Sequence, residues 1–338
     1  MKLAGVVFLT VLFCLLPTVV SHTAAADWKI QKQIKLPAKA SALAYSSDGT
    51  RLAVGHSDGR VSIWNLKSGE LVHLLEAHSK EANSVQFILK DSKLLTIGDD
   101  NKARIWSTSD WRNEATIDGV AFSGGVSPDG RWLAAQDPKQ SIWLWDLETL
   151  KPVKQMTAPG KGGTQNINFT ADGNYIVTAY STPLLINVES KQVASFASRG
   201  DKKTPLRIDQ QGSQASVSLG TMQDDDAPTH RLIPSRQGRL VALGRGWYGS
   251  SAFVDVWDIG SMKRLGRYKA KDLGTLTSFS FDNSLLAIEG AERVTIWTIG
   301  TGKQATSVKG SGIMQFSPTA LELAVTDGMD LILYSPTN

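Results

Sequence analysis

Few side chains in this sequence stand at spacings that could support chemistry. His78 and Asp100 could form an acid–base dyad, in which a carboxylate orients an imidazole for proton transfer. Asp224, Asp225 and Asp226 are consecutive carboxylates, which could contribute oxygen ligands to a hard cation such as calcium. Because buried polar side chains need mutual hydrogen bonds, we favour a structural role for His78 and Asp100. For the three aspartates we favour a solvated acidic loop.

A glycine-rich segment, Gly244-Arg245-Gly246-Trp247-Tyr248-Gly249, matches the G-x-G-x-x-G pattern of dinucleotide-binding proteins. In those proteins a helix follows the glycines, and its N-terminus faces the pyrophosphate. Here Ala252-Phe253-Val254-Asp255-Val256-Trp257 follows, which has the composition of a strand. The segment is therefore predicted to be a loop between strands. The sequence also has no H-E-x-x-H, G-x-S-x-G or P-loop motif, so we predict no catalytic residue, cofactor or metal ion.

The N-terminal 26 residues have the features of a secretory signal peptide. Lys2 is basic, residues 3–20 are almost wholly apolar, and Ala24-Ala25-Ala26 supplies the small residues that signal peptidase needs. We predict cleavage after Ala26 and a mature chain of residues 27–338; an uncleaved membrane anchor is the alternative. Cys14 is the only cysteine and would leave with the signal. We expect a secreted protein of a bacterial periplasm, with no stable membrane insertion after cleavage.

The composition of the chain is that of a globular protein. Hydrophobic residues make up 41% and charged residues 20%, which is too apolar and too evenly charged for a disordered chain. The 36 Lys and Arg residues and 32 Asp and Glu residues give a net charge of only +4. A nucleic-acid-binding protein would be expected to carry a dense basic stripe, so we predict no nucleic-acid partner.

One short phrase recurs along the chain: an aliphatic residue, an aromatic residue, a small polar residue and another aliphatic residue. Clear copies are Ile63-Trp64-Asn65-Leu66 and Leu144-Trp145-Asp146-Leu147. When the weaker copies are included, the second position of the phrase is occupied by Trp64, Trp106, Trp145, Ile186, Trp257, Trp297 and Tyr334. The intervals between them are 42, 39, 41, 71, 40 and 37 residues, and all but one lie near forty. This regularity indicates an internal structural repeat.

A polar turn and a short apolar run precede each of these positions. Ser127-Pro128-Asp129-Gly130 stands before Trp132-Leu133-Ala134, and Ala171-Asp172-Gly173 stands before Tyr175-Ile176-Val177. Asp-Gly pairs are typical of the tight turn between antiparallel strands, and the flanking runs have the length of strands. Each unit is therefore predicted to be a four-stranded sheet that cannot bury both of its faces alone.

The repeat near forty residues, the Ser-Pro-Asp-Gly turn and the Trp-Asp pair resemble the WD-repeat β-propeller family over nearly all of residues 27–338. The resemblance implies an all-β, seven-bladed propeller in a single domain. The last repeat ends at Tyr334 without its fourth strand, whereas residues 28–36 alternate like a strand that has no unit of its own. We predict that this N-terminal strand pairs with the last blade and closes the ring. Eight blades are the alternative.

The 71-residue interval contains about thirty residues more than one repeat of about forty, and we place them at residues 199–229. Residues 204–219 are expected to form a hairpin around Gln210-Gln211-Gly212. Only ten residues separate Gly220 from the strand that begins at Arg231, which is too few for two more strands and their turns. An inserted hairpin is therefore preferred to an eighth blade.

WD repeats often contain a buried, hydrogen-bonded set of His, Ser or Thr, Asp and Trp side chains. The resemblance implies that the second repeat holds such a structural set, formed by His78, Thr96, Asp100 and Trp106. The first repeat keeps Asp58 and Trp64 at the same six-residue spacing, and other repeats have lost the aspartate. The chain is therefore interpreted as a divergent member of the family.

The fifth repeat has an enlarged loop between its second and third strands. Ala242 and Trp257 are 15 residues apart, whereas Ala53 and Trp64 are 11 apart. In a propeller this loop and the insertion emerge on the same rim at neighbouring positions, so we expect them to meet. We interpret the surface there as partner-binding, with candidate residues Arg199, Lys202, Lys203, Arg245, Trp247 and Tyr248. The alternative is that Trp247 packs beneath the insertion.

These features predict a monomeric, non-catalytic scaffold that binds a protein partner through the rim loops of the propeller. Two other functions stay open. A propeller enzyme of the lactonase or quinoprotein-dehydrogenase kind would need a polar, metal-bearing funnel on the axis. A module that binds small molecules or glycans would need a deep channel lined by aromatic residues.

Overall fold

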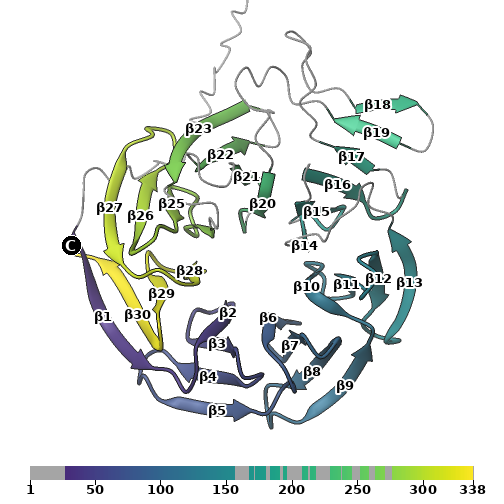
Figure 1. The fold of residues 1–338 in the computed structure, drawn as a ribbon, viewed down its shortest axis with the longest axis horizontal. Coiled ribbons are helices and arrows are strands. Elements are labelled where there is room, and N and C mark those ends of the chain that lie inside the picture. Colours follow the sequence, from purple (N-terminus) through teal and green to yellow (C-terminus); the bar gives the residue numbers. More distant parts are fainter. Residues whose placement is uncertain are drawn as a thin grey trace, which may run out of the picture.

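The computed structural model describes residues 27–156, 167–170, 172–179, 183–190, 193–195, 208–211, 214–217, 229–236, 238–245, 252–258, 263–270 and 276–337. In this part of the chain the strands form seven four-stranded antiparallel sheets and one two-stranded hairpin. The seven sheets stand around a central axis as the blades of a propeller (Figure 1). The predicted all-β, seven-bladed fold is confirmed.

The strands follow the same order, from the axis to the rim, in every blade. The innermost strands are β2 (Ala40–Tyr45), β6 (Ala82–Ile88), β10 (Ala121–Val126), β14 (Ile167–Phe169), β20 (Thr229–Pro234), β24 (Thr277–Phe279) and β28 (Met314–Phe316). The second strands are β3 (Arg51–His56), β7 (Lys93–Gly98), β11 (Trp132–Gln136), β15 (Tyr175–Ala179), β21 (Leu240–Arg245), β25 (Leu285–Ile288) and β29 (Leu323–Asp327). The third strands, which carry the repeated phrase, are β4 (Val61–Asn65), β8 (Lys102–Ser107), β12 (Ile142–Asp146), β16 (Pro183–Asn187), β22 (Ala252–Asp258), β26 (Arg293–Thr298) and β30 (Asp330–Pro336). The outermost strands are β5 (Leu71–Leu75), β9 (Asn113–Asp118), β13 (Lys151–Met156), β17 (Val193–Ser195), β23 (Lys263–Ala270), β27 (Gln304–Lys309) and β1 (Trp28–Lys35).

The insertion between the fourth and fifth blades does not form an eighth blade, so that alternative is wrong. Between β17 and β20 the described residues contain only the hairpin of β18 (Ile208–Gln211) and β19 (Gln214–Val217). The hairpin pairs from Ile208↔Val217 to Gln211↔Gln214, within the segment predicted to form one. It stands outside the ring, where β19 lies beside the rim strand β17 (Figure 1).

The N-terminal strand closes the ring, as predicted. β1 pairs antiparallel with β30 from Trp28↔Pro336 to Lys35↔Asp330 and forms the outermost strand of the last blade. Hydrogen bonds continue beyond both ends of this ladder, because Leu36 N–H donates to Met329 O at 2.8 Å and Thr337 N–H donates to Asp27 O at 2.8 Å. The two ends of the folded chain are therefore held together in one sheet.

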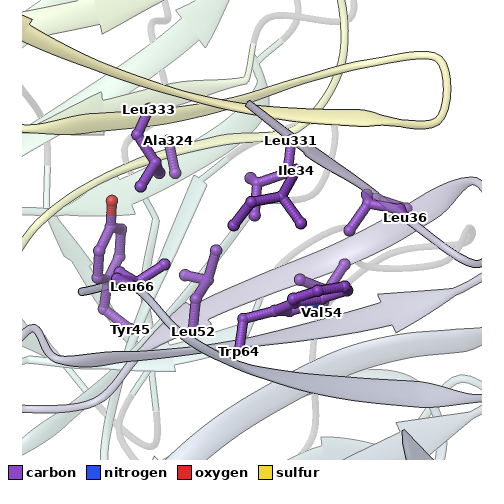
Figure 2. Close-up of a cluster of buried hydrophobic side chains, with 11 residues drawn as sticks. Ile34, Leu36, Tyr45, Leu52, Val54, Trp64, Leu66, Ala324, Leu331 and Leu333 are labelled. Atoms are coloured by element: carbon purple, nitrogen blue, oxygen red, sulfur yellow. The ribbon is translucent and has the colours of Figure 1, made fainter. Parts of the chain in front are cut away.

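Packing between the last and first blades reinforces the closure. Figure 2 shows Ile34, Leu331 and Leu333 of the last blade facing Leu52, Val54 and Trp64 of the first. Leu36 joins the same cluster and is 2% exposed. Tyr45 Oη also donates a hydrogen bond across this seam, to Glu322 Oε1 at 3.2 Å. The closing strand thus contributes apolar side chains as well as backbone pairing.

Each blade buries one face against the blade before it and the other face against the blade after it. Trp64 packs with the last blade, whereas its neighbour Ile63 packs with Val85 and Leu94 of the second blade. Successive residues of a strand point to opposite faces, so a single third strand serves both interfaces. An open ring would therefore leave two apolar faces in water.

Outer strands also contact the next blade through side chains at one equivalent position. Lys32 Nζ donates to Leu66 O at 2.9 Å and to Lys67 O at 2.7 Å, both in the turn after β4. Lys154 Nζ makes the same pair of bonds to residues 188 and 189 of the fourth blade. His73 stands at this position in the first blade and stacks on Trp111 with 5.7 Å between ring centroids. In all three blades the residue follows the β-bulge of the outer strand pair.

The two faces of the ring differ in their turns. The lower face, as we define it, carries the turns from first to second and from third to fourth strand within a blade. The upper face carries the turns from second to third strand and the connections between blades. On the lower face, Asp48, Asp129, Asp172 and Asp282 each accept a hydrogen bond from the hydroxyl two residues earlier, at 2.5 to 2.6 Å. These bonds are the structural reason for the recurrent Asp-Gly turn.

The described part of the chain consists of strands and turns, and it contains no helix long and apolar enough to cross a membrane.

Deleting residues 27–37 should unfold the protein or make it aggregate. The deletion removes the pairing with β30 and the buried side chains of Ile34 and Leu36. Each lost side chain of this size costs about 2–5 kcal/mol, against a typical total stability of about 5–15 kcal/mol. Thermal unfolding followed by circular dichroism measures the effect.

Lys29→Ala is the matched control, because this side chain lies on the same strand but is exposed. It should melt like the intact protein. A deleted chain that also melts like the intact protein would contradict closure by β1.

Candidate functional site

Most of the candidate partner-binding residues lie outside the described residues. These are Arg199, Lys202, Lys203, Trp247 and Tyr248. Arg245 is the last residue of β21, and its backbone alone is described. The structure does describe the strands to which the insertion and the enlarged loop are attached, which are β17, β20 and β21.

The pairing of β20 with β21 brings the end of the insertion next to the start of the enlarged loop. The insertion ends at Thr229, the first residue of β20, and Thr229 pairs with Arg245. Arg245 is the residue from which the enlarged loop, residues 246–251, departs on the upper face. The connection that contains the insertion begins after Ser195 at the end of β17, on the rim of the neighbouring blade. Both irregular segments of the repeat are therefore anchored side by side on the upper face of the fourth and fifth blades (Figure 1).

The structure brings together the four side chains of the structural set in the second blade. Trp106 Nε1–H donates to Thr96 Oγ1 at 3.0 Å, and Thr96 Oγ1 lies 2.9 Å from His78 Nε2. His78 Nδ1 lies 2.9 Å from Asp100 Oδ1. Since the ionised Asp100 can only accept, the one N–H of the neutral His78 imidazole lies on Nδ1, and Nε2 is left to accept the proton of the Thr96 hydroxyl. This order satisfies all four side chains at once.

Arg104 extends this set, and sequence reasoning missed it. Its guanidinium Nη1 donates to Asp100 Oδ2 at 2.9 Å and lies 2.7 Å from His78 Nδ1. Arg104 stands two residues before Trp106, so its side chain points to the same face of β8 as the indole. This position before the repeated aromatic residue is the sequence signal that could have revealed it.

The protonation state of the set follows from burial. Burial lowers the pKa of the His78 imidazole below its usual value, and the hydrogen bond to Asp100 opposes this effect only in part. Burial would raise the pKa of Asp100, but hydrogen bonds from His78 and Arg104 outweigh it and hold that pKa below its usual value. The His78 side chain is 0% exposed, and both of its nitrogens are engaged. The arrangement therefore fits a structural set and offers no free nitrogen for acid–base chemistry.

The first blade builds a comparable set from different residues. Trp64 Nε1–H donates to Ser62 Oγ at 2.8 Å, Ser62 Oγ lies 2.7 Å from His56 Nε2, and His56 Nδ1 lies 3.1 Å from Ala38 O. The six-residue spacing of Asp58 and Trp64 was misleading, because Asp58 accepts hydrogen bonds from its neighbour Arg60 instead. Ser62, like Arg104, stands two residues before the repeated tryptophan.

Other blades lack an acceptor for the indole. Among the described residues, Trp257 Nε1 and Trp297 Nε1 have no hydrogen-bond partner. The position that Thr96 holds in the second blade is occupied there by Leu243 and Ile288, whose side chains cannot accept a hydrogen bond. In the fourth blade the acceptor is present but the indole is missing. Thr178 is buried there without a hydrogen-bond partner, and Ile186 replaces the tryptophan.

An ion pair between the buried Asp255 and the partly exposed Arg267 in the fifth blade is a further feature that sequence reasoning missed. Asp255 is 0% exposed and accepts two hydrogen bonds from Arg267, from Nε at 2.8 Å and from Nη2 at 2.9 Å. The guanidinium also lies over the Phe253 ring, 4.1 Å from its centroid. Asp255 again stands two residues before the repeated tryptophan, so this position carries a local polar network in the first, second and fifth blades.

Asp224, Asp225 and Asp226, considered above as possible calcium ligands, lie outside the described residues. Within the residues that are described, no group of three or more His, Cys, Asp or Glu side chains is arranged to hold a metal ion.

Three comparisons place the chain among known proteins. The family model described as "Anaphase-promoting complex subunit 4 WD40 domain" matches residues 25–90. The pre-rRNA-processing protein IPI3 of Yarrowia lipolytica is 31% identical over 323 residues, which are 91% of this chain and 63% of that protein. The protein groucho of Drosophila melanogaster is 27% identical over 168 residues, which are 46% of this chain and 23% of that protein. The chain thus spans less than two thirds of these relatives.

A solved structure supports the fold independently. The β-propeller domain of Cps50 (Swd1) from Myceliophteria thermophila superposes with a TM-score of 0.70, covering 92% of this chain and 100% of that one. The two sequences are 16% identical, so the likeness concerns the fold alone.

Thr96→Val should destabilise the protein, whereas Thr178→Val should not. The first change leaves Trp106 Nε1 and His78 Nε2 buried without partners, at a cost of about 1–3 kcal/mol for each unsatisfied group. The second change removes a hydroxyl that already lacks a partner, at the equivalent position of another blade. Urea-induced unfolding gives both free energies, and equal losses would contradict the role assigned to Thr96.

Acidification from about pH 7.5 to about pH 5.5 should lower the free energy of unfolding. Burial lowers the pKa of His56 and of His78 in the folded protein, so in this range the unfolded chain, with an ordinary pKa of about 6.5, binds protons first. Stability is therefore lost as the pH falls below about 6.5, by at most about 1.4 kcal/mol per pH unit for each histidine. Urea unfolding at several pH values measures the slope, and constant stability across this range would contradict the buried, neutral state of both imidazoles.

Proposed function

Because the chain belongs to the WD-repeat β-propeller family, we propose that it is a non-catalytic scaffold that binds a protein partner on the upper face of its fourth and fifth blades. The observation that carries the proposal is the pairing of Thr229 with Arg245. This pair joins the end of the insertion to the start of the enlarged loop. The two segments that are longer than their counterparts in the other repeats therefore share one anchor.

The residues of these segments suit contact with a protein. Trp247 and Tyr248 offer a large contact area at low cost in conformational entropy. Arg199, Lys202, Lys203 and Arg245 add donors for carboxylates and backbone carbonyls. A rigid ring suits such loops, because the ring fixes their ends while their sequences are free to vary.

One feature supports a role without catalysis. His78 and Asp100, the one pair that resembled a catalytic dyad, are engaged with each other and with Thr96 and Arg104.

The proposal includes secretion, into a periplasm, of a monomer that begins at Asp27. Its support is the sequence of residues 1–26, with a basic residue, an apolar stretch and three terminal alanines. Cleavage after Ala26 would leave the whole of β1, which begins at Trp28, available to close the ring.

Replacing Trp247 and Tyr248 together by alanine should abolish partner binding and leave the melting temperature unchanged. Partners are captured on the purified protein from its native compartment, identified by mass spectrometry and then titrated as purified proteins. Lys139→Ala, in the corresponding loop of the third blade, is the matched control and should bind normally. A lower melting temperature of the double variant would instead indicate that Trp247 packs beneath the insertion.

A further inference from the structure

One cross-strand pair in the fifth blade carries charges of opposite sign. Asp255 of β22 stands two residues before the repeated tryptophan and pairs with Arg267 of β23. The corresponding pairs of the other blades contain at most one charged residue: Ser62↔Leu74, Arg104↔Thr116, Trp143↔Gln155, Leu184↔Ser195, Thr295↔Ser307 and Ile332↔Gln33. The pair is therefore a departure from the repeat that is confined to this blade.

The ion pair leaves a polar group of its own blade unsatisfied. In the first blade Ser62 stands where Asp255 stands in the fifth, and it accepts a hydrogen bond from Trp64 Nε1 at 2.8 Å. A carboxylate could accept from Trp257 in the same way, but Trp257 Nε1 has no hydrogen-bond partner among the described residues. Arg267 instead donates to both oxygens of Asp255, through Nε at 2.8 Å and Nη2 at 2.9 Å.

The burial of this pair argues against a role in stability alone. The Asp255 side chain is 0% exposed and the Arg267 side chain is 30% exposed. The desolvation penalty of a buried carboxylate often exceeds the attraction between the two charges, so such a pair is weak evidence for stability. The unsatisfied indole N–H destabilises the blade further. What the pair holds in place is therefore the better explanation for its presence.

Arg267 also holds an aromatic ring near the upper end of the blade. Its guanidinium lies over the Phe253 ring, 4.1 Å from the centroid. Phe253 and Asp255 are two residues apart on β22, so they lie on the same face of the sheet. The residue at the corresponding position, four before the second residue of the repeated phrase, is polar in every other blade: Arg60, Lys102, Ser141, Thr182, Arg293 and Asp330. Only the fifth blade has an aromatic residue there, and the guanidinium of Arg267 covers it.

Phe253 belongs to the row of residues that anchors the proposed binding surface. One row of paired residues crosses the four strands of the blade, from Thr229 through Arg245 and Phe253 to Lys269. The insertion ends at the first of these residues, and the enlarged loop leaves β21 at the second. The loop returns to β22 at Ala252, next to Phe253. A contact that holds Phe253 therefore also holds the place where the loop returns.

We infer that Arg267 is a positioning residue of the proposed binding surface. It connects the outer strand β23 to Asp255 and Phe253, and it thereby fixes the returning end of the enlarged loop relative to the end of the insertion. A loop whose ends are held in one arrangement loses less conformational entropy when it binds a partner. This inference rests on the proposed scaffold function. It adds Phe253, Asp255 and Arg267 as residues that hold the surface in place.

A transfer of the first blade's arrangement into the fifth separates positioning from stability. The double variant Asp255→Ser with Arg267→Leu receives the serine and leucine that the first blade has at Ser62 and Leu74. The new hydroxyl can accept the hydrogen bond of the Trp257 indole, and the buried carboxylate is gone, so the melting temperature should stay the same or rise.

Another ion pair of the same blade supplies the matched control. Arg239 Nε donates to Asp258 Oδ2 at 2.9 Å, at the lower end of β22. The double variant Asp258→Ser with Arg239→Leu removes this pair and leaves the upper end of the strand as it is.

Amide hydrogen exchange of the peptide that spans residues 244–254, read by mass spectrometry, measures positioning. We expect exchange to be about tenfold faster in Asp255→Ser with Arg267→Leu, and unchanged in the control. Phe253→Ser is the second test variant, because the third blade has Ser141 at this position, and it should also exchange faster. If the first variant melts at a lower temperature, Phe253→Ser decides. Exchange like that of the wild type in both test variants overturns the inference.

Binding is measured with short peptides selected from a phage-displayed random library on the purified full chain. Peptides that lose affinity for the variant with Trp247 and Tyr248 replaced by alanine report the proposed surface. Their affinity should fall about tenfold for Asp255→Ser with Arg267→Leu and stay the same for the control. Unchanged affinity for that test variant overturns the inference, while the proposed function stands. Selected peptides that all bind the Trp247 and Tyr248 variant like the wild type, or a library that yields no binding peptide, count against both.

Discussion

Ring closure is the constraint on which the rest of this structure depends. Each blade has two apolar faces and buries each of them only against a neighbour, so the ring is stable only when its first and last blades meet. Residues 27–338 contain no cysteine, and packing with hydrogen bonds must hold the junction. The pairing of β1 with β30 and the burial of Ile34 and Leu36 supply both at the same place.

Within this ring the blades solve one local problem in different ways. A tryptophan on the third strand brings an N–H group into the core, and that group needs an acceptor. Thr96 provides it in the second blade and Ser62 in the first, each backed by a histidine. In the fifth and sixth blades the indole nitrogens of Trp257 and Trp297 are buried without a hydrogen-bond partner among the described residues. The ring as a whole tolerates such defects because every blade is held on both sides.

The repeat in the sequence predicted the number of blades and the closing strand, but the sequence did not predict the hydrogen bonds and ion pairs of individual side chains. The spacing of the tryptophans and the unpaired residues 28–36 were sufficient for the seven blades and the closing strand. The six-residue spacing between Asp58 and Trp64 wrongly indicated a hydrogen-bonded set in the first blade that includes Asp58, because the Asp58 carboxylate binds Arg60 instead. It could not reveal the pairing of Asp255 with Arg267, because this depends on a contact between two strands. Of the candidate partner-binding surface, the structure describes only the backbone of Arg245, which pairs with Thr229 at the end of the insertion, so the surface itself stays a prediction.

Amide hydrogen exchange of the intact protein, read by mass spectrometry, tests the central claim of ring closure most directly. The peptide that covers β1 is compared with the peptide that covers β5, which holds the same outer position in the next blade. If β1 closes the ring, both peptides should exchange equally slowly and lose protection together, through global unfolding. A β1 peptide that exchanges much faster than β5, while the other strands stay protected, would contradict the account.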